Sequence, residues 1–275
     1  RLTKAVVGER ELKPHKNEGG TKREEVVLEV KDLTVKNDRE LEAIKKVSFD
    51  IHAGEILGIA GVAGNGQKEL AEAVAGLRKV VGGTITIHGE DVTTQGAKAR
   101  VKKRVGFIPE DRLSMGLVPG MNMEENRILK EYDTPRFSKN HILKKKVIHD
   151  TVQDEINRYA IKTAGDKSPV SLMSGGNQQK LLVAREIGGD PVLLVAVYPS
   201  RGLDMGAAEA IHEILLEQCK KGVAVLLISE ELDELFQMSD RIGVLCSGEM
   251  MAVLDRNEAD YDTIGRLMSG ERYEK

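Results

Sequence analysis

A short apolar run followed by a glycine-rich loop and a helix is the feature that most constrains this chain. Residues 55–60 read Glu-Ile-Leu-Gly-Ile-Ala, the nearly continuous apolar pattern of a parallel strand that is buried on both faces. Glycines recur through residues 61–66, and a helical pattern follows from about Lys68 to Ala75. Strand, glycine loop and helix in this order are typical of a phosphate-binding site. The alternative is a glycine turn that only links strand to helix.

The second half of the chain alternates between strand and helix patterns. The predicted strands are 192–197, 223–228 and 242–245, and the predicted helices are 207–219 and 231–238. Further strands are expected at 26–30, 33–35, 47–51, 84–88 and 105–108. Alternating units of this kind predict an α/β fold with a parallel sheet covered by helices on both faces. Residues 121–164 are charged and poorer in glycine, which predicts a helical insertion.

Composition limits the function classes. The 275 residues are 40% hydrophobic and 31% charged, enough for one large domain or one domain with subdomains. A net charge of -3 argues against a general nucleic-acid binder. The longest apolar runs have strand length, well short of the roughly 20 residues of a membrane helix. Any membrane role is therefore expected to come through a partner.

Cysteine and histidine usage gives no metal pattern. Cys219 and Cys246 lie far apart, as expected of two thiols in a reducing compartment, and the six histidines have no ligand spacing. We therefore predict no metal site built from protein side chains. Residues 1–25 are polar and read as a linker or leader before a domain at 26–275, and the chain begins at Arg1 rather than Met. We expect a fragment of a longer protein.

The glycine loop departs from the G-x-x-x-x-G-K-[ST] frame of a phosphate loop. Its candidate nucleotide-binding residues are Gly61, Gly64, Asn65, Gly66, Gln67, Lys68 and Glu69. Gln67 stands at the lysine position and offers a hydrogen-bond donor without a charge. A lysine there would form a charge pair with a phosphate, and such a pair at 4 Å contributes about 4 kcal/mol at an effective dielectric of 20. Lys68 stands at the hydroxyl position that would hold Mg²⁺. Because Lys68 lies one residue after the usual lysine position, its side chain leaves the helix about 100° further around, so it replaces the missing charge only in part.

A second candidate anion site lies at Ser174–Lys180, which reads Ser-Gly-Gly-Asn-Gln-Gln-Lys. Ser174 is predicted as the N-cap of a helix, and two glycines leave the backbone N–H groups uncovered. Free N–H groups and the positive end of the helix dipole favour an anion there. Alone, a Ser-Gly-Gly pattern more often marks an ordinary capped helix after a turn.

The full string resembles the signature sequence of ABC-type ATPases, in the version found in sugar and nucleoside importers. The resemblance covers about residues 26–270 and includes the second nucleotide motif at Pro191–Asp204. It implies a P-loop NTPase core with a mostly parallel sheet, an antiparallel β subdomain and a helical subdomain at about 115–172. In that family the signature contacts the γ-phosphate of an ATP held by a partner domain. The residues implied in this role are Ser174, Gly175, Gly176, Asn177 and Gln178, and the dimer-seam loop is Gly202, Leu203 and Asp204.

Several positions depart from the family pattern. Val197 and Tyr198 replace the Asp–Glu pair that holds Mg²⁺ and polarises water, Glu230 replaces a histidine, and Glu110 replaces the Q-loop glutamine. Valine has no acceptor, and a tyrosine with a pKa near 10 is a poor base at neutral pH. Residues 36–44 lack the aromatic that usually stacks on adenine. One substitution alone is explained by drift or a shifted alignment, but together they predict no catalytic residue in the domain's own site.

The resemblance therefore implies the C-terminal half of a tandem importer ATPase, weakly active or inactive in isolation. It implies ATP as cofactor and Mg²⁺ mainly at the partner site. The expected partners are the N-terminal half of the same polypeptide, membrane permease subunits and, indirectly, an extracytoplasmic solute-binding protein, without nucleic acid, at the cytoplasmic face of the membrane. The amino-acid sequence at residues 64–67 and 198–204 resembles nucleoside importers more than ribose or galactose importers. A non-catalytic pseudo-ATPase and a non-transport ABC protein remain alternatives.

Overall fold

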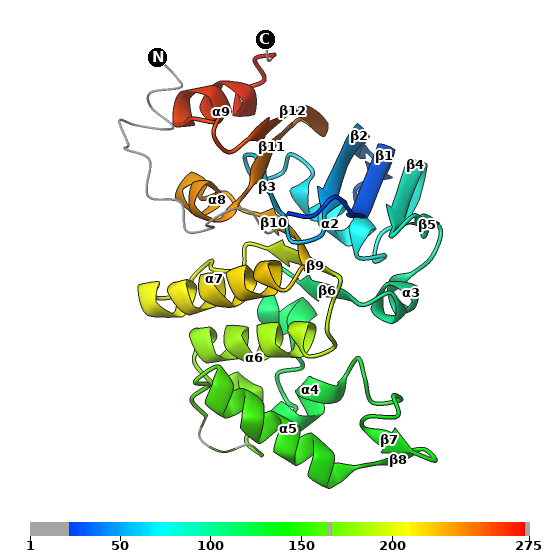
Figure 1. Ribbon diagram of the computed structural model, residues 1–275, viewed down its shortest axis with the longest axis vertical. Helices are drawn as coiled ribbons and strands as arrows, with labels where there is room; N and C mark the ends of the chain where they lie inside the picture. Colours follow the sequence, from blue (N-terminus) through cyan, green and yellow to red (C-terminus); the bar gives the residue numbers. More distant parts are fainter. Residues whose placement is uncertain (1–21, 164, 166, 273–275) are drawn as a thin grey trace. The chain divides into compact units, whose positions relative to one another are not determined.

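The computed structural model describes residues 22–163, 165 and 167–272 (Figure 1). Most of the predicted leader, residues 1–21, lies outside the described residues. The chain divides into two compact units. Unit 1 comprises the chain up to Phe107, Val192–Tyr198, and the chain from Leu215 onward. Unit 2 comprises Ile108–Pro191 and Pro199–Ile214.

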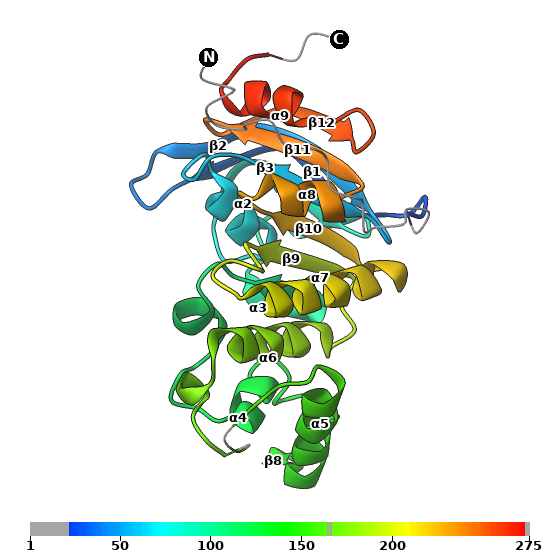
Figure 2. The ribbon, with the colours of Figure 1, turned by 90° about the vertical axis from the view of Figure 1, so that its left-hand side faces the viewer.

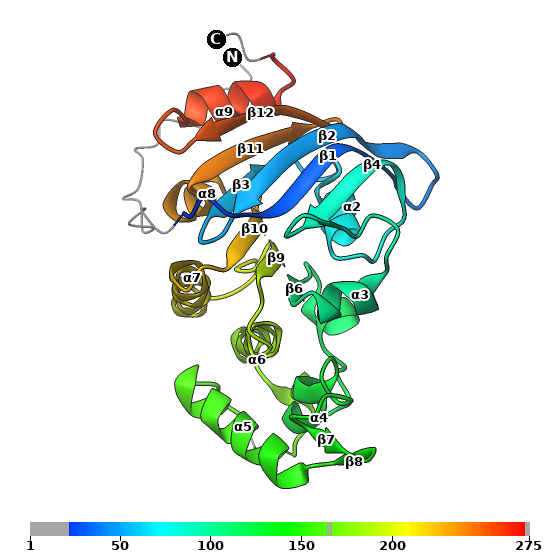
Figure 3. The same ribbon diagram turned by 45° about the vertical axis from the view of Figure 1, so that its right-hand side comes forward.

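Unit 1 contains an antiparallel four-stranded sheet in the order β2-β1-β4-β5, of which Figure 3 shows β2, β1 and β4 side by side. The strands are β1 (Val26–Lys36), β2 (Glu42–His52), β4 (Val80–Ile87) and β5 (Glu90–Asp91). The sequence predicted two strands within β1. The structure has one, because the pairing register shifts between Val30 and Leu33, where Asp32 takes φ +46°. This bulge lets the strand continue while Leu28, Val30, Leu33 and Val35 all stay buried.

The second sheet of unit 1 has six strands in the order β12-β11-β3-β10-β9-β6. They are β3 (Ile56–Ala60), β6 (Val105–Ile108), β9 (Leu193–Val197), β10 (Ala224–Ile228), β11 (Arg241–Cys246) and β12 (Glu249–Asp255). The pairs β11–β3, β3–β10 and β10–β9 are parallel, and β12 is antiparallel to β11. Strands β3, β9 and β10 are buried at every position, as their continuous apolar runs predict.

Helices cover the strands of unit 1. They are α2 (Gln67–Val74), α3 (Ala97–Lys102), α8 (Leu232–Met238), α9 (Tyr261–Met268) and the last residues of α7 (Met205–Lys220). The sequence pattern suggested neither β12 nor α9. Figure 2 shows α9 lying along β11 and β12, which it contacts. Strand β12 is partly buried over most of its length and gives little alternation. Helix α9 does have an apolar stripe, with Tyr261, Ile264 and Leu267 buried, so its pattern was present in the sequence and was overlooked.

Unit 2 is mainly helical. It holds α4 (Met123–Ile128), α5 (Lys145–Arg158), α6 (Gly175–Ile187), the start of α7, and the short turns η1 (Arg112–Gly116) and η2 (Val170–Leu172). The predicted helical insertion is interrupted by a small hairpin, β7 (Ser138–Lys139) and β8 (Ile142–Leu143), which pattern reasoning missed. No helix within the described ranges is long and apolar enough to cross a membrane.

Candidate functional site

The carboxyl ends of three parallel strands bring the predicted nucleotide motifs of unit 1 together. Ile228 of β10 pairs with Ile59 of β3 and with Val197 of β9. The glycine loop, Tyr198 and Glu230 each follow directly after one of these strands, so they share one edge of the sheet. The Tyr198 N–H donates to the Ile228 carbonyl at 2.8 Å. In open α/β sheets this edge is the usual place for a ligand.

Two glycines of the loop are required by close backbone approach. A Cβ on Gly66, where φ is +107°, would lie 2.4 Å from the Ala43 carbonyl oxygen. A Cβ on Gly61 would lie 2.5 Å from Nε2 of Gln67 and 2.7 Å from the Leu245 carbonyl oxygen. Gly64 takes φ +88° and faces open space. The loop is therefore tightly fixed at both ends and open in its middle.

The side chain of Gln67 makes its hydrogen bond within the glycine loop. It is only 2% exposed, and its Nε2 donates to the Val62 carbonyl at 3.0 Å. Asn65 holds the neighbouring β11–β12 turn, because its Oδ1 accepts from Ser247 N at 2.8 Å. Both polar side chains thus stabilise the loop itself, and neither brings a charge to it.

Lys68 lies between two carboxylates. Its Nζ is 3.9 Å from Oδ2 of Asp38 and 3.9 Å from Oε1 of Glu72. Arg78 joins the same acids, with Nη2 2.9 Å from Asp38 and Nε 2.6 Å from Glu72. The Arg78 hydrogen bond lowers the pKa of Asp38 below its usual value. The charge that replaces the loop hydroxyl is therefore neutralised by residues that sequence reasoning did not identify, while Glu69 lies half-buried in the first turn of α2.

This edge of the sheet offers backbone donors for a phosphate, while the end of β9 carries a valine and a tyrosine in place of carboxylates. The first N–H groups of α2 lack intrahelical partners, which suits an anion. Val197 is 3% exposed within the apolar core, and Tyr198 packs partly buried against the same core. Glu230 is exposed. In the part of the chain that the structure describes, no group of three or more His, Cys, Asp or Glu side chains could hold a metal ion.

In unit 2, Ser174 takes the predicted N-cap position of α6, with φ −64° and ψ 155°. Its hydroxyl accepts from Nδ2 of Asn177 at 2.8 Å and makes no cap bond to a backbone N–H, contrary to the expectation of side-chain capping. The opening N–H groups of α6 are thus left uncapped by this residue. Gln178 is 5% exposed, and its Nε2 donates to the carbonyls of Val170 and Met173 at 3.1 Å each. It fixes the turn that leads into the helix.

The Gly202–Asp204 loop lies next to this turn within unit 2. A Cβ on Gly176 would lie 2.9 Å from Cβ of Ala207 and 3.9 Å from Oδ2 of Asp204. Gly202 takes φ +69°, and Oδ1 of Asp204 accepts from Ala207 N at 2.9 Å at the start of α7. The Leu203 N–H donates to the Ser200 carbonyl at 3.2 Å. The structure therefore joins the two motifs predicted to face a partner domain.

Two arginines accompany this pair of loops and were not predicted as site residues. Glu110 is exposed and accepts from Nη1 of Arg201 at 2.6 Å. A Cβ on Gly175 would lie 3.1 Å from Nη2 of Arg112, so the guanidinium rests against the start of α6. The run of charged residues Glu110-Asp111-Arg112 was the available signal, for Arg112 alone. Their contacts depend on loops that are distant in sequence, which the pattern does not reveal.

Comparison with known proteins agrees with these motifs. The profile of a protein family described as "ABC transporter" matches residues 44–196. The nucleoside import ATP-binding protein NupA of Lactococcus lactis subsp. cremoris is 42% identical over 90% of this chain and 49% of its own length. The guanosine import ATP-binding protein NupO of Bacillus subtilis is 41% identical over 89% and 48%, and the ribose import ATP-binding protein RbsA of Shouchella clausii is 34% identical over 89% and 48%. The chain thus spans about half the length of the curated relatives that it matches.

Solved structures support the predicted fold class. The ATP-binding cassette MJ0796, in a dimeric post-hydrolysis state with ADP and phosphate, superposes with a TM-score of 0.71 at 21% identity, covering 83% of this chain and 98% of the cassette. A nucleotide-free ATP-binding cassette from an ABC transporter also gives 0.71, at 22% identity, covering 85% and 93%. The mixed α/β fold expected from the sequence is confirmed.

Proposed function

Because the chain belongs to the ABC transporter family, we propose that it is one ATP-binding domain of a longer importer ATPase. It acts mainly by donating its Ser174 turn to a nucleotide that a partner domain holds. A tandem arrangement agrees with the span of this chain, which is 49% and 48% of NupA and NupO. We place it as the C-terminal half, joined to an N-terminal half whose glycine loop holds ATP and Mg²⁺.

The observation that carries this proposal is the contrast between the two sets of motifs. At the domain's own loop, Gln67 is bonded to Val62, Lys68 lies between acids, and Val197 is buried in the core. At the Ser174 turn, the Ser174 side chain makes no cap bond to the N–H groups that open α6, and the guanidinium of Arg112 lies beside Gly175. The glycine-loop site of this chain therefore has few catalytic groups, while the Ser174 turn retains its hydrogen-bond donors.

Phosphoryl transfer is accelerated mainly by positioned donors that stabilise charge on the transferring group. ATP with its Mg²⁺ at the partner loop supplies the reacting phosphate. This chain contributes the N–H groups of Gly175 and Gly176 and the hydroxyl of Ser174. Gln178 and Gln179 keep that turn in place through carbonyls at Met173 and Pro199. The Gln179 bond also ties α6 to Pro199, at the start of the segment that leads into the Gly202–Asp204 loop.

A nucleoside is the proposed solute class. The identity to the nucleoside and guanosine import proteins is 42% and 41%, against 34% for the ribose import protein of S. clausii. Solute choice belongs to permease subunits and a solute-binding protein, so this chain works at the cytoplasmic face of the membrane as a peripheral component. The test compares uptake of labelled guanosine and of labelled ribose in cells that lack the whole gene and in cells to which it has been restored.

The decisive experiment measures ATP turnover of the full-length protein with its permease. Ser174→Ala is expected to lower turnover at least about tenfold, since loss of a single positioned donor commonly costs more than that. Ser171→Ala, an exposed serine in the same turn, is the matched control and should leave turnover within about twofold. Equal effects of the two variants would contradict the assignment of the turn.

A pseudo-ATPase whose partner site is also inactive is the second candidate, favoured by the degenerate loop of this chain. The sequence of the other half separates the two possibilities. A Lys-Ser or Lys-Thr phosphate loop and an Asp–Glu strand end there would support the importer ATPase. Purification with ribosomes or DNA, and without a permease, would instead favour a non-transport ABC protein.

A further inference from the structure

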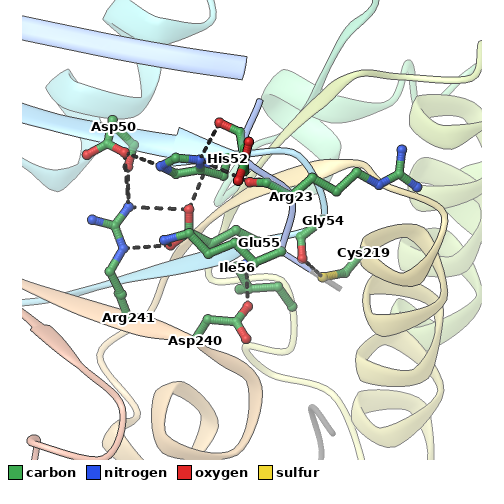
Figure 4. Close-up of polar contacts among 11 residues, drawn as sticks. Arg23, Asp50, His52, Gly54, Glu55, Ile56, Cys219, Asp240 and Arg241 are labelled. Atoms are coloured by element: carbon green, nitrogen blue, oxygen red, sulfur yellow. Dashed lines mark hydrogen bonds and ion pairs between the residues drawn. The ribbon is translucent and has the colours of Figure 1, made fainter. Parts of the chain in front are cut away.

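A buried carboxylate stands at the beginning of β3, at the opposite end of that strand from the glycine loop. Glu55 is fully buried. Its Oε1 accepts from Nε of Arg241 at 2.6 Å, and its Oε2 accepts from the His52 N–H at 2.7 Å (Figure 4). Nζ of Lys22 is the third donor, 3.1 Å from Oε1. We call Lys22, His52, Glu55 and Arg241 the Glu55 cluster.

The backbone that follows Lys22 is held by His52 and Ala53, next to the Glu55 cluster. The Arg23 N–H donates to the Ala53 carbonyl at 2.8 Å, and the Ala53 N–H donates to the Glu25 carbonyl at 2.9 Å. Nδ1 of His52 lies 3.1 Å from the Arg23 carbonyl oxygen and 3.2 Å from that of Glu24. Figure 4 shows Arg23 directly beside the His52 ring. Four consecutive residues, 22–25, are thus fastened to the β2–β3 turn before β1 begins.

The cluster is electrostatically dependent on its cations. An isolated buried carboxylate is strongly unfavourable, so Glu55 needs its donors. Burial alone would lower the pKa of Arg241, but the hydrogen bond and attraction from Glu55 raise it above its usual value. Arg241 and His52 come from the domain itself. Among the described residues that precede β1, Lys22 is the one whose charged group reaches Glu55.

We infer that the Glu55 cluster is an anchor for the segment that leads into β1: it holds residues 22–25 against the β2–β3 turn. The occupant is the chain's own Lys22–Glu25 segment. The anchor lies at the start of β3, and Gly61 follows the other end of the same five-residue strand. In a tandem protein this segment connects the two halves, and that part of the inference rests on the proposed function. The anchor itself depends only on contacts within this chain.

Amide hydrogen exchange on the 275-residue chain tests the anchor. Lys22→Met keeps the aliphatic stem and removes the charge. It should accelerate exchange at the Arg23 and Ala53 amides about tenfold, equivalent to about 1.4 kcal/mol of local opening. Lys22→Arg, which restores a cation, should return both amides close to the rates of the unaltered protein.

Lys31→Met is the matched control, because Lys31 makes an exposed ion pair with Glu29 at 2.8 Å on β1. It should leave the Arg23 and Ala53 amides unchanged. Unaltered exchange in Lys22→Met, or an equal acceleration at the buried amides of β10, would overturn the anchor. Since the measurement needs no partner domain, a failed tandem assignment would leave its result intact.

Discussion

The side-chain amide of Gln67 donates a hydrogen bond to the Val62 carbonyl, 3.0 Å away, and so closes the glycine loop on itself. A lysine at this position would bring a mobile charge to a bound phosphate. The next residue, Lys68, does have a charge, but it lies 3.9 Å from each of two carboxylates, those of Asp38 and Glu72. The loop therefore has the shape of an anion site, and we expect it to attract a phosphate less strongly than a loop with a free lysine would.

Gln67→Lys is expected to tighten nucleotide binding without restoring hydrolysis. A charge-assisted hydrogen bond to phosphate contributes about 1.5 kcal/mol or more, which is about tenfold in affinity. Titration with a fluorescent ATP analogue measures the affinity, and phosphate release measures turnover. Because Val197 and Tyr198 still replace the acidic pair, turnover should stay at the background of the unaltered chain. Ordinary ABC ATPase turnover from either isolated protein would falsify the inactive-site proposal.

Nucleotide binding by the isolated chain should be nearly independent of Mg²⁺. The Ser/Thr position of the loop holds Lys68, and the valine at the acidic position is 3% exposed in the core. Titrations with Mg²⁺ and with a chelator should give dissociation constants within about threefold of each other. Lys68→Ser, which supplies the missing hydroxyl, is the comparison variant. A large gain from Mg²⁺ in the unaltered chain would reveal a metal ligand elsewhere at this edge.

Gly58→Ala should destabilise unit 1. A Cβ there would lie 2.3 Å from Oγ of Ser239 and 2.9 Å from Cδ2 of Leu235, because α8 packs directly on β3. Overpacking of this kind costs about 1–3 kcal/mol. Urea unfolding measures the loss. Gly120→Ala, where an added Cβ meets nothing within 4 Å, serves as control and should change stability by less than about 0.5 kcal/mol.

Glu155 in unit 2 should give the folded protein a measurable pH dependence. Burial raises its pKa above the usual value, although Arg127, with Nε 2.6 Å from Oε1, acts in the opposite direction. A raised folded-state pKa means that the folded chain takes up this proton more readily than the unfolded chain. The contribution of Glu155 to stability therefore grows as pH falls through the folded pKa and is lost as pH rises through it.

Comparison with Glu155→Gln isolates this contribution. The unfolding free energy of the unaltered chain, minus that of the variant, should increase as pH falls through the raised folded-state pKa of Glu155 towards the usual pKa of a glutamate, about 4.3. Other titrating groups are common to both proteins and largely cancel in the difference. A difference that is constant with pH would mean that Glu155 titrates alike in the folded and unfolded states.

Much of unit 1 was readable from the sequence because its central strands are buried on both faces. Strands β3, β9 and β10 form continuous apolar runs, which leave few alternatives. The small hairpin β7–β8 was not readable, since two-residue strands have too little pattern. Strand β12 is only partly buried along most of its length, so it too lacks a clear alternation.

The sequence by itself determined the parallel core, the two glycine-bearing turns and the absence of acidic residues at the end of β9, because each depends on residue type at fixed spacing. Only the tertiary structure decided how the charges around those turns are used. Lys68 meets Asp38, Glu110 meets Arg201 and Glu55 meets Lys22 across separations of 30, 91 and 33 residues. Coulombic and hydrogen-bond partners act over a few ångströms in space, and local sequence patterns do not encode which distant loops the fold brings that close.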